Sequence, residues 1–105
     1  MQQNMDVINM ENQFNKALRL LDFGRIEKAI NILKEIIVEA SNKHNSLFYI
    51  RANCVLGELL FSNGKQDEAR QYLTEVINTI YENDLVDYEK SIASKILNQI
   101  NKDSN

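Results

Sequence analysis

Apolar side chains recur at helical spacing through almost the whole chain, in five stretches separated by short polar segments. In the second stretch, Ile26, Ile30 and Leu33 follow the i, i+4, i+7 spacing that places side chains on one face of a helix. Nowhere does an alternation of apolar and polar residues persist long enough to predict a strand. Proline is absent and there are only three glycines, so little interrupts a helix. The pattern predicts an all-α fold of about five helices, over residues 6–22, 26–41, 46–62, 66–82 and 86–101.

The predicted helix ends carry residues that commonly stop and start helices. Gly24 and Gly64 each follow an apolar stretch, where glycine readily adopts the left-handed conformation that closes a helix. Asn45 and Ser46 are N-cap candidates for the third helix, because a short polar side chain can accept a hydrogen bond from the first backbone N–H groups. We expect residues 83–84 to have the same role before the last helix.

Two parts of the chain repeat each other at an offset of 40 residues. Gly24 and Gly64 are separated by this offset, and so are Ala29 and Ala69. The same shift aligns four further pairs: Leu20 with Leu60, Leu21 with Phe61, Leu33 with Leu73, and Ile36 with Val76. A shift that brings glycine, alanine and apolar residues onto like residues indicates a repeated structural unit.

The repeated unit resembles the tetratricopeptide repeat, a helical hairpin with small residues where its two helices touch. Gly57 and Ala17 stand where the family has a small residue in the first helix. The other matches are the turn glycines Gly24 and Gly64, the small residues Ala29 and Ala69, and the bulky residues Leu33 and Leu73. Small residues at such positions let two backbones approach closely.

The chain departs from the family in three respects. Its unit spans 40 residues instead of about 34, Gln13 and Asn53 replace the first-helix aromatic residue, and the terminal proline is absent. The resemblance implies a single domain over 1–105, with repeat units at about 10–49 and 50–85 and a capping helix at 86–101. We expect these units to stack as antiparallel hairpins in a short right-handed superhelix, and a plain five-helix bundle is the alternative.

The resemblance also implies where a partner binds, because the first helices of tetratricopeptide units line a concave groove. Carried over to this sequence, the partner-binding positions are Glu11, Phe14, Asn15, Leu18, Arg51, Glu58, Asp87, Lys90 and Ser94. The same helix faces also include Asp22, Cys54, Val55, Ser62 and Leu97. Phe14, Leu18 and Leu97 are equally suited to the core. Polar side chains on a half-apolar surface suit a peptide or the edge of a protein.

Residues with catalytic or metal-binding chemistry are few. His44 is the only histidine and lies in a polar segment, and Cys54 is the only cysteine and lies in an apolar stretch, where a thiol usually packs inertly. This pair cannot supply the common zinc sites, and the glycines are too scattered for a phosphate-binding loop. A Cys54–His44 nucleophile pair is the remaining enzymatic alternative. We therefore expect no cofactor, no metal site and no enzyme activity.

Charge is unevenly distributed along the chain. The formal net charge is −3, but residues 67–89 contain seven acidic residues and one basic residue, Arg70, for a local charge of −6. This stretch is either a solvated helix face or an acidic surface that attracts a basic partner. Elsewhere the basic residues are dispersed among acids, so neither nucleic acid nor a membrane surface is an expected partner.

The binding of another protein is the function that these features favour. A groove of barely two repeat units suits a dedicated partner, basic in charge under the acidic-surface interpretation. Immunity proteins or antitoxins that neutralise a toxin, and chaperones of secreted effectors, are small helical proteins of this kind. A structural homodimer is the alternative. The richness in Asn, Ile and Lys favours a bacterial source, and a single cysteine with no signal-peptide pattern favours the cytoplasm. Because the chain begins with Met and ends in a polar tail, we expect a complete small protein.

Overall fold

The computed structural model describes residues 2–103, with side chains described from residue 7 onward. The described elements are α1 (Gln2–Asp22), α2 (Ile26–Asn42), α3 (Ser46–Ser62), α4 (Gln66–Asn78), the short 3-10 helix η1 (Asp84–Val86) and α5 (Asp87–Asp103). Residues 2–103 contain no strand. The predicted all-α fold with five α-helices is therefore confirmed.

Two helix ends differ most from the predicted bounds. α1 begins at Gln2 instead of residue 6, and α4 ends at Asn78 instead of residue 82. The backbone turns to an extended conformation at Thr79, with φ −85° and ψ 122°. The ammonium group of Lys90 on α5 donates hydrogen bonds to carbonyl oxygens at this end of α4. If α4 continued, backbone N–H groups of its next turn would donate to these carbonyl oxygens. The contact with Lys90 satisfies the oxygens instead and therefore favours the end of α4 at Asn78.

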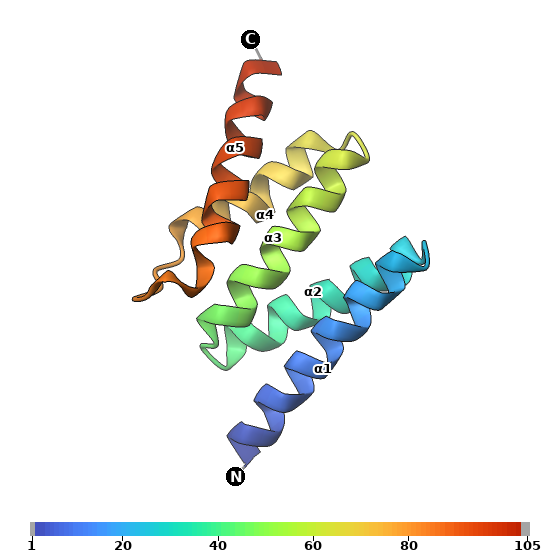
Figure 1. Ribbon diagram of the computed structural model, residues 1–105, viewed down its shortest axis with the longest axis vertical. Coiled ribbons are helices and arrows are strands. Elements are labelled where there is room, and N and C mark those ends of the chain that lie inside the picture. The colour runs from blue at the N-terminus through green and yellow to red at the C-terminus, as the bar shows by residue number, and fades with distance from the viewer. Residues whose placement is uncertain (1, 104–105) are drawn as a thin grey trace.

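The helices are arranged as antiparallel hairpins that follow one another along the chain (Figure 1). α1 pairs with α2, α3 pairs with α4, and α5 packs against both α3 and α4. In the described part of the chain, the backbones of α1 and α5 do not approach each other, and the molecule extends over 50 × 33 × 20 Å. A closed bundle brings its first and last helices together, so this order of contacts is that of an open stack of hairpins. The right-handed superhelix and the tetratricopeptide assignment stay predictions.

The two glycine turns have the same backbone structure. Gly24 and Gly64 adopt left-handed φ angles of 75° and 81°, as predicted from their position after an apolar stretch. The same hydrogen bond closes both turns, from Arg25 N to Leu20 O and from Lys65 N to Leu60 O, each 2.8 Å long. This bond from the residue after the left-handed position is the one that ends a helix in a Schellman motif. The 40-residue repeat is thus present in the backbone of the turns.

The turn between α2 and α3 closes in the same way without glycine. His44 holds the left-handed position with φ 55°, and the following Asn45 N donates to Ala40 O at 2.8 Å. Asn45 then caps α3, because its Oδ1 accepts a hydrogen bond from Phe48 N at 3.1 Å. The predicted N-cap is confirmed, and it starts α3 directly after α2 ends.

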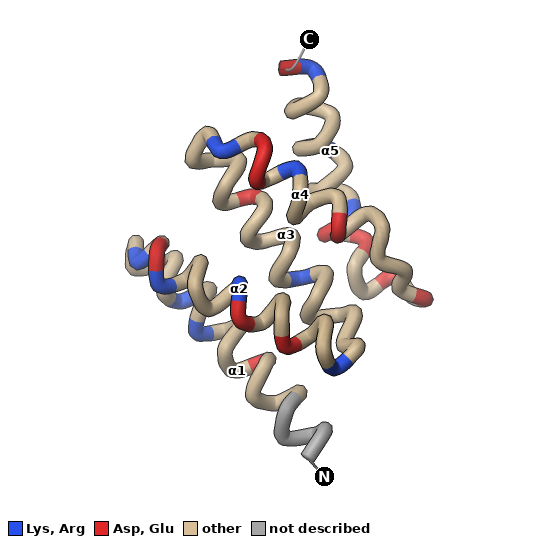
Figure 2. Tube along the Cα trace, turned by 180° about the vertical axis from the view of Figure 1, so that it is seen from behind, with Lys and Arg blue, Asp and Glu red and all other residues tan. Residues whose placement is uncertain are grey.

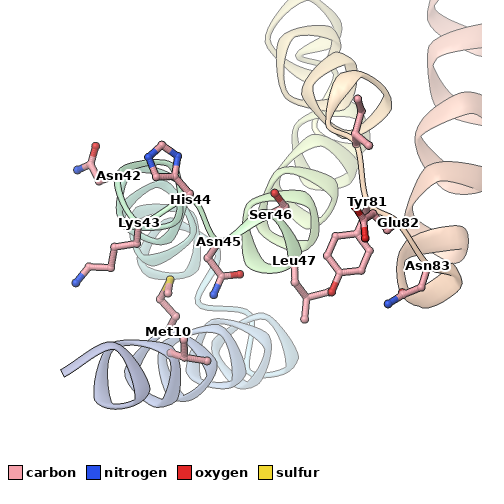
Figure 3. A pocket seen from close by; sticks show the side chains of 12 residues that line it. Met10, Asn42, Lys43, His44, Asn45, Ser46, Leu47, Tyr81, Glu82 and Asn83 are labelled. Carbon is pink, nitrogen blue, oxygen red and sulfur yellow. The ribbon is translucent and has the colours of Figure 1, made fainter. Parts of the chain in front are cut away.

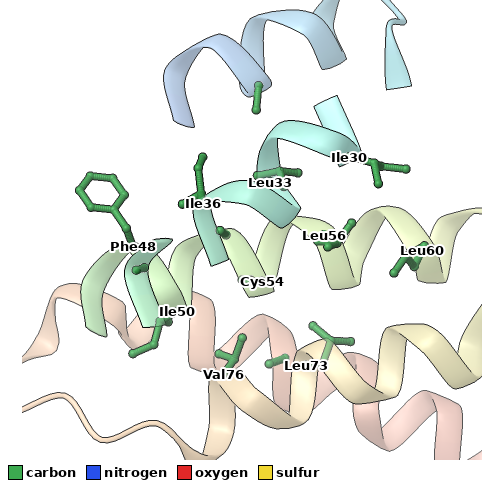
Figure 4. Packing of buried hydrophobic residues seen from close by; sticks show 14 of the residues in the cluster. Ile30, Leu33, Ile36, Phe48, Ile50, Cys54, Leu56, Leu60, Leu73 and Val76 are labelled. Atoms are coloured by element: carbon green, nitrogen blue, oxygen red, sulfur yellow. The ribbon is translucent and has the colours of Figure 1, made fainter. Parts of the chain in front are cut away.

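Three of the residue pairs that the repeat aligns are buried alike in the core. Figure 4 shows two of them, Leu33 with Leu73 and Ile36 with Val76. Ala29 and Ala69 are both fully buried, and so are Leu33 and Leu73. Gly57 on α3 lies against Leu73 on α4, where a Cβ atom on the glycine would be 2.5 Å from Leu73 Cγ. The second hairpin therefore has a small residue where its helices touch, as the sequence predicts.

We expect Ala29→Leu and Ala69→Leu each to lower the free energy of unfolding by about 1–3 kcal/mol, because both sites are closed and a larger side chain overpacks them. Urea unfolding followed by circular dichroism measures the change. Asn31→Leu and Gln71→Leu are matched controls on the exposed faces of the same helices. Alanine-site variants as stable as these controls would contradict the repeat alignment.

Candidate functional site

A groove of about 440 Å³ runs between α1, α3 and the first turn of α5. α1 contributes Val7, Glu11, Phe14 and Asn15, α3 contributes Leu47, Phe48, Arg51, Cys54, Val55 and Glu58, and α5 contributes Tyr88 and Glu89. On each of the two long helices these residues recur every three or four positions, which places them on one face. The alternating direction of the hairpins brings α1, α3 and α5 to the same side of the molecule (Figure 1).

The floor of the groove is apolar and held by core packing. The ring of Phe14 meets the buried ring of Phe48 edge to face, with centroids 6.0 Å apart and an angle of 62° between the planes. Cys54 is also buried, and Val55 beside it is partly exposed to the groove. Such a floor is fixed in shape and offers apolar contact area to an incoming side chain.

Charged side chains surround this floor. Arg51 Nε lies 3.7 Å from Glu89 Oε2, and the two side chains are 32% and 18% exposed. Glu58 is half-buried further along α3, and Glu11 is exposed on α1. Among the described residues, neither Glu58 nor Glu11 forms an ion pair. Three carboxylates and one guanidinium group line the groove, so it is acidic.

Glu89 places a carboxylate within the apolar stripe of α5. It precedes Ala93, Ile96 and Ile100 at helical spacing, and the stripe packs on the core. Its Oε1 atom is buried and accepts no hydrogen bond within the described part of the chain. An unpaired buried carboxylate oxygen costs free energy, because it has lost water without gaining another donor.

Burial raises the pKa of two ionisable groups in the groove, Cys54 and Glu58. Burial raises the pKa of Cys54 to about 12, and the negative charges of Glu58 and Glu89 add to the effect. The Cys54 thiol also lies 3.8 Å from the backbone oxygen of Glu89, as a weak donor. Burial raises the pKa of Glu58 as well. The groove therefore disfavours additional negative charge.

We expect Cys54 in the folded chain to react with iodoacetamide at least about a hundredfold more slowly than in the unfolded chain. The reason is that the thiolate is the reactive form and a raised pKa makes it scarce. Mass spectrometry of the alkylated chain at mildly alkaline pH, with and without urea, measures both rates. Equal rates in the two states would show that the thiol is accessible and ionised, against the burial described above.

The structure brings five of the predicted partner-binding residues into this groove: Glu11, Phe14, Asn15, Arg51 and Glu58. Cys54 and Val55, on the same predicted face, also line it. Leu18, Asp87 and Ser94 are exposed on their helices but lie outside the groove lining. Asp22 and Ser62 are exposed at the last residues of α1 and α3, and Leu97 packs against the core.

Lys90 has a different environment from the one that the repeat register implies. Its Nζ atom donates to the backbone oxygens of Val76, Ile77 and Thr79 at 3.0, 3.3 and 2.6 Å. The half-buried ammonium group thus closes the C-terminal end of α4, where the negative end of the helix dipole favours a cation.

Five groove residues were outside the predicted set: Val7, Leu47, Phe48, Tyr88 and Glu89. Val7 lies one helical turn before Glu11, so extending the α1 face backward would have found it. Glu89 is a carboxylate at the spacing of an apolar stripe, which is an unusual position for an acid. Tyr88 is 70% exposed beside it. No feature of the sequence singles out this tyrosine.

A second hollow, of about 1060 Å³, adjoins the groove at Val7 and Leu47, which line both. Residues 42–47 and 80–83 form its walls together with Met10 (Figure 3). Its lining is mostly loop and helix-end residues with polar side chains, and His44 is exposed there. Its described ionisable side chains are Lys43, His44, Tyr81 and Glu82.

The acidic residues of 67–89 are spread along α4, the turn after it and the start of α5, not gathered at one point (Figure 2). Six of the seven are exposed, and Glu89 is the one that enters the groove. Glu75 is tied to α3, because its Oε1 accepts a 2.6 Å hydrogen bond from the Tyr49 hydroxyl. Burial and this contact raise the pKa of Tyr49 to about 12. The stretch is thus diffusely negative, and of its acids only Glu89 lines the groove.

Comparisons with protein-family models, with curated proteins and with solved structures each found no match for this chain. Among the helices of residues 2–103, none has both the length and the apolar character needed to span a bilayer.

Proposed function

We propose that this chain is a non-catalytic protein-interaction module and that a protein partner binds in the groove between α1, α3 and α5. The single observation that carries the proposal is the groove itself, a preformed concavity with an apolar floor and charged walls. Interfaces of this kind combine an apolar centre with a polar surround. The resemblance to tetratricopeptide hairpins supports the same face on α1 and α3, because the repeat register alone singles out groove residues of these two helices.

The diffuse negative charge of residues 67–89 supports a partner of opposite sign. The exposed acids of residues 67–87 would attract a basic protein over distances of about a Debye length, roughly 10 Å at 0.1 M salt. Immunity proteins and antitoxins that cover a basic toxin are one class with this behaviour, and chaperones of secreted effectors are another. A dedicated partner of either class fits a groove of this small size.

A random peptide display library selected on the whole chain tests the proposal and does not require the natural partner. Val55→Arg places a bulky charge at a half-buried groove position, and Gln71→Arg makes the matched change on the exposed face of α4. We expect Val55→Arg to weaken the selected peptides at least about tenfold, or 1.4 kcal/mol, while Gln71→Arg leaves them unchanged. Equal affinity for both variants would overturn the proposal.

Sedimentation equilibrium of the purified chain separates this function from the homodimer. We expect a monomer at the concentrations used for peptide binding. A dimer that Val55→Arg dissociates would instead assign the groove to a second copy of the chain.

A further inference from the structure

The groove carries more negative than positive side chains near Cys54. Glu58, one helical turn after Cys54 on α3, and Glu89 on α5 both line the groove, and the Cys54 thiol lies 3.8 Å from the backbone oxygen of Glu89. Arg51 is the one cation that lines the groove in the described part of the chain. It cannot neutralise both acids, and Glu11 adds a third carboxylate from α1.

Arg51 also leaves Glu89 incompletely paired. The 3.7 Å between Arg51 Nε and Glu89 Oε2 is longer than a hydrogen bond, so the contact is electrostatic only. Oε1 of the same carboxylate is buried and receives no donor from the described residues. The Glu89 side chain is 18% exposed, so a cation with N–H groups that entered the groove would meet its carboxylate and donate the hydrogen bond that Arg51 does not supply. Charge-assisted hydrogen bonds of this kind are among the strongest in proteins.

The surroundings of the two acids are apolar and aromatic. Phe14 and Val55 contribute to the floor, and the exposed ring of Tyr88 stands next to Glu89 in the chain. An aromatic ring beside a carboxylate favours the flat guanidinium group or an ammonium group, which can contact the ring face. The methylene stem of a long basic side chain would cover the apolar floor.

Resting on the function proposed above, we propose that the groove recognises a protein segment with a Lys or Arg side chain flanked by apolar side chains, and that this cation binds between Glu58 and Glu89. The segment supplies the positive charge that the groove lacks. Its apolar neighbours pack on Phe14 and Val55.

The peptides selected on the whole chain test this inference directly. We expect them to share one Lys or Arg with apolar residues on either side. Replacing that residue by methionine in a synthetic copy of the peptide is expected to weaken binding at least about tenfold, measured by calorimetry. Glu58→Gln and Glu89→Gln in the protein are expected to weaken the basic peptide similarly and to leave the methionine peptide almost unchanged. Glu82→Gln is the matched control, because it removes the same charge from an exposed site outside the groove.

Each outcome bears on one of the two proposals. Peptides that depend on Val55 but contain no shared basic residue would overturn this inference and leave the groove as the binding face. An effect of Glu82→Gln as large as that of Glu89→Gln would also overturn it, because overall charge would then explain the binding. Peptides indifferent to Val55→Arg would overturn the proposed function itself.

Discussion

Replacing Leu73 with alanine is expected to lower the free energy of unfolding by about 2–5 kcal/mol. Leu73 is fully buried on α4 and fills the space opposite Gly57 on α3. Removing its side chain leaves a cavity that the two helix backbones cannot close without moving. Urea unfolding of the purified chain measures the loss. Ile77→Ala, on the partly exposed face of the same helix, is the control and is expected to cost much less.

The cavity left by Leu73→Ala should remove the destabilising effect of a second substitution, Gly57→Ala. In the wild-type chain, Gly57→Ala is expected to cost about 1–3 kcal/mol, because the added Cβ would lie 2.5 Å from Leu73 Cγ and the buried leucine has little room to shift. In the Leu73→Ala background that contact is absent, and the better helix propensity of alanine should make Gly57→Ala neutral or stabilising. Additive effects of the two changes would contradict a direct contact between these residues.

Replacing Lys90 with methionine is expected to lower the free energy of unfolding by about 2–4 kcal/mol. Methionine keeps the apolar stem but removes three N–H donors, which leaves carbonyl oxygens at the end of α4 without their partner. The change also removes a cation from a helix C-terminus, where it is electrostatically favourable. Hydrogen exchange should show the largest loss of protection in the last turn of α4.

Lys95→Met is the matched control for this prediction, because Lys95 is exposed on the same helix. Its effect on unfolding is expected to be within about 0.5 kcal/mol. If the two lysine variants were equally stable, the contacts of Lys90 with α4 would contribute nothing to the fold, and the explanation of how α4 ends would be wrong.

The helices and their turns follow closely from local features of the sequence. Gly24 and Gly64 mark two turns because a left-handed residue is needed there, and Asn45 caps α3 through its own side chain. Helical periodicity identifies the apolar face of each helix from neighbouring residues. The 40-residue offset pairs Ala29 with Ala69 on such faces, and both are buried. Helix ends and helix faces depend mainly on residues that are close together in the sequence.

Contacts between elements far apart in the sequence were harder to predict. α4 ends early because Lys90, more than ten residues later in the chain, occupies its last carbonyl oxygens. Periodicity alone would continue the helix through Ile80, whose side chain is 85% exposed in the turn. The repeat register predicts that Lys90 lies in the groove, because the register specifies only a helix face. It does not specify which groups a long flexible side chain contacts. Glu89 is the opposite case, because the register does not include it and tertiary packing nevertheless buries most of its side chain in the groove.

The central claim is that the groove between α1, α3 and α5 is the binding face, and backbone amide NMR of the labelled whole chain tests it most directly. Titration with a selected basic peptide is expected to shift signals of residues 7–15, 47–58 and 88–89, which carry the groove lining. The outer faces of α2 and α4 should remain unchanged. Shifts concentrated instead at residues 31–38 or 67–75, with the groove signals unmoved, would contradict the claim.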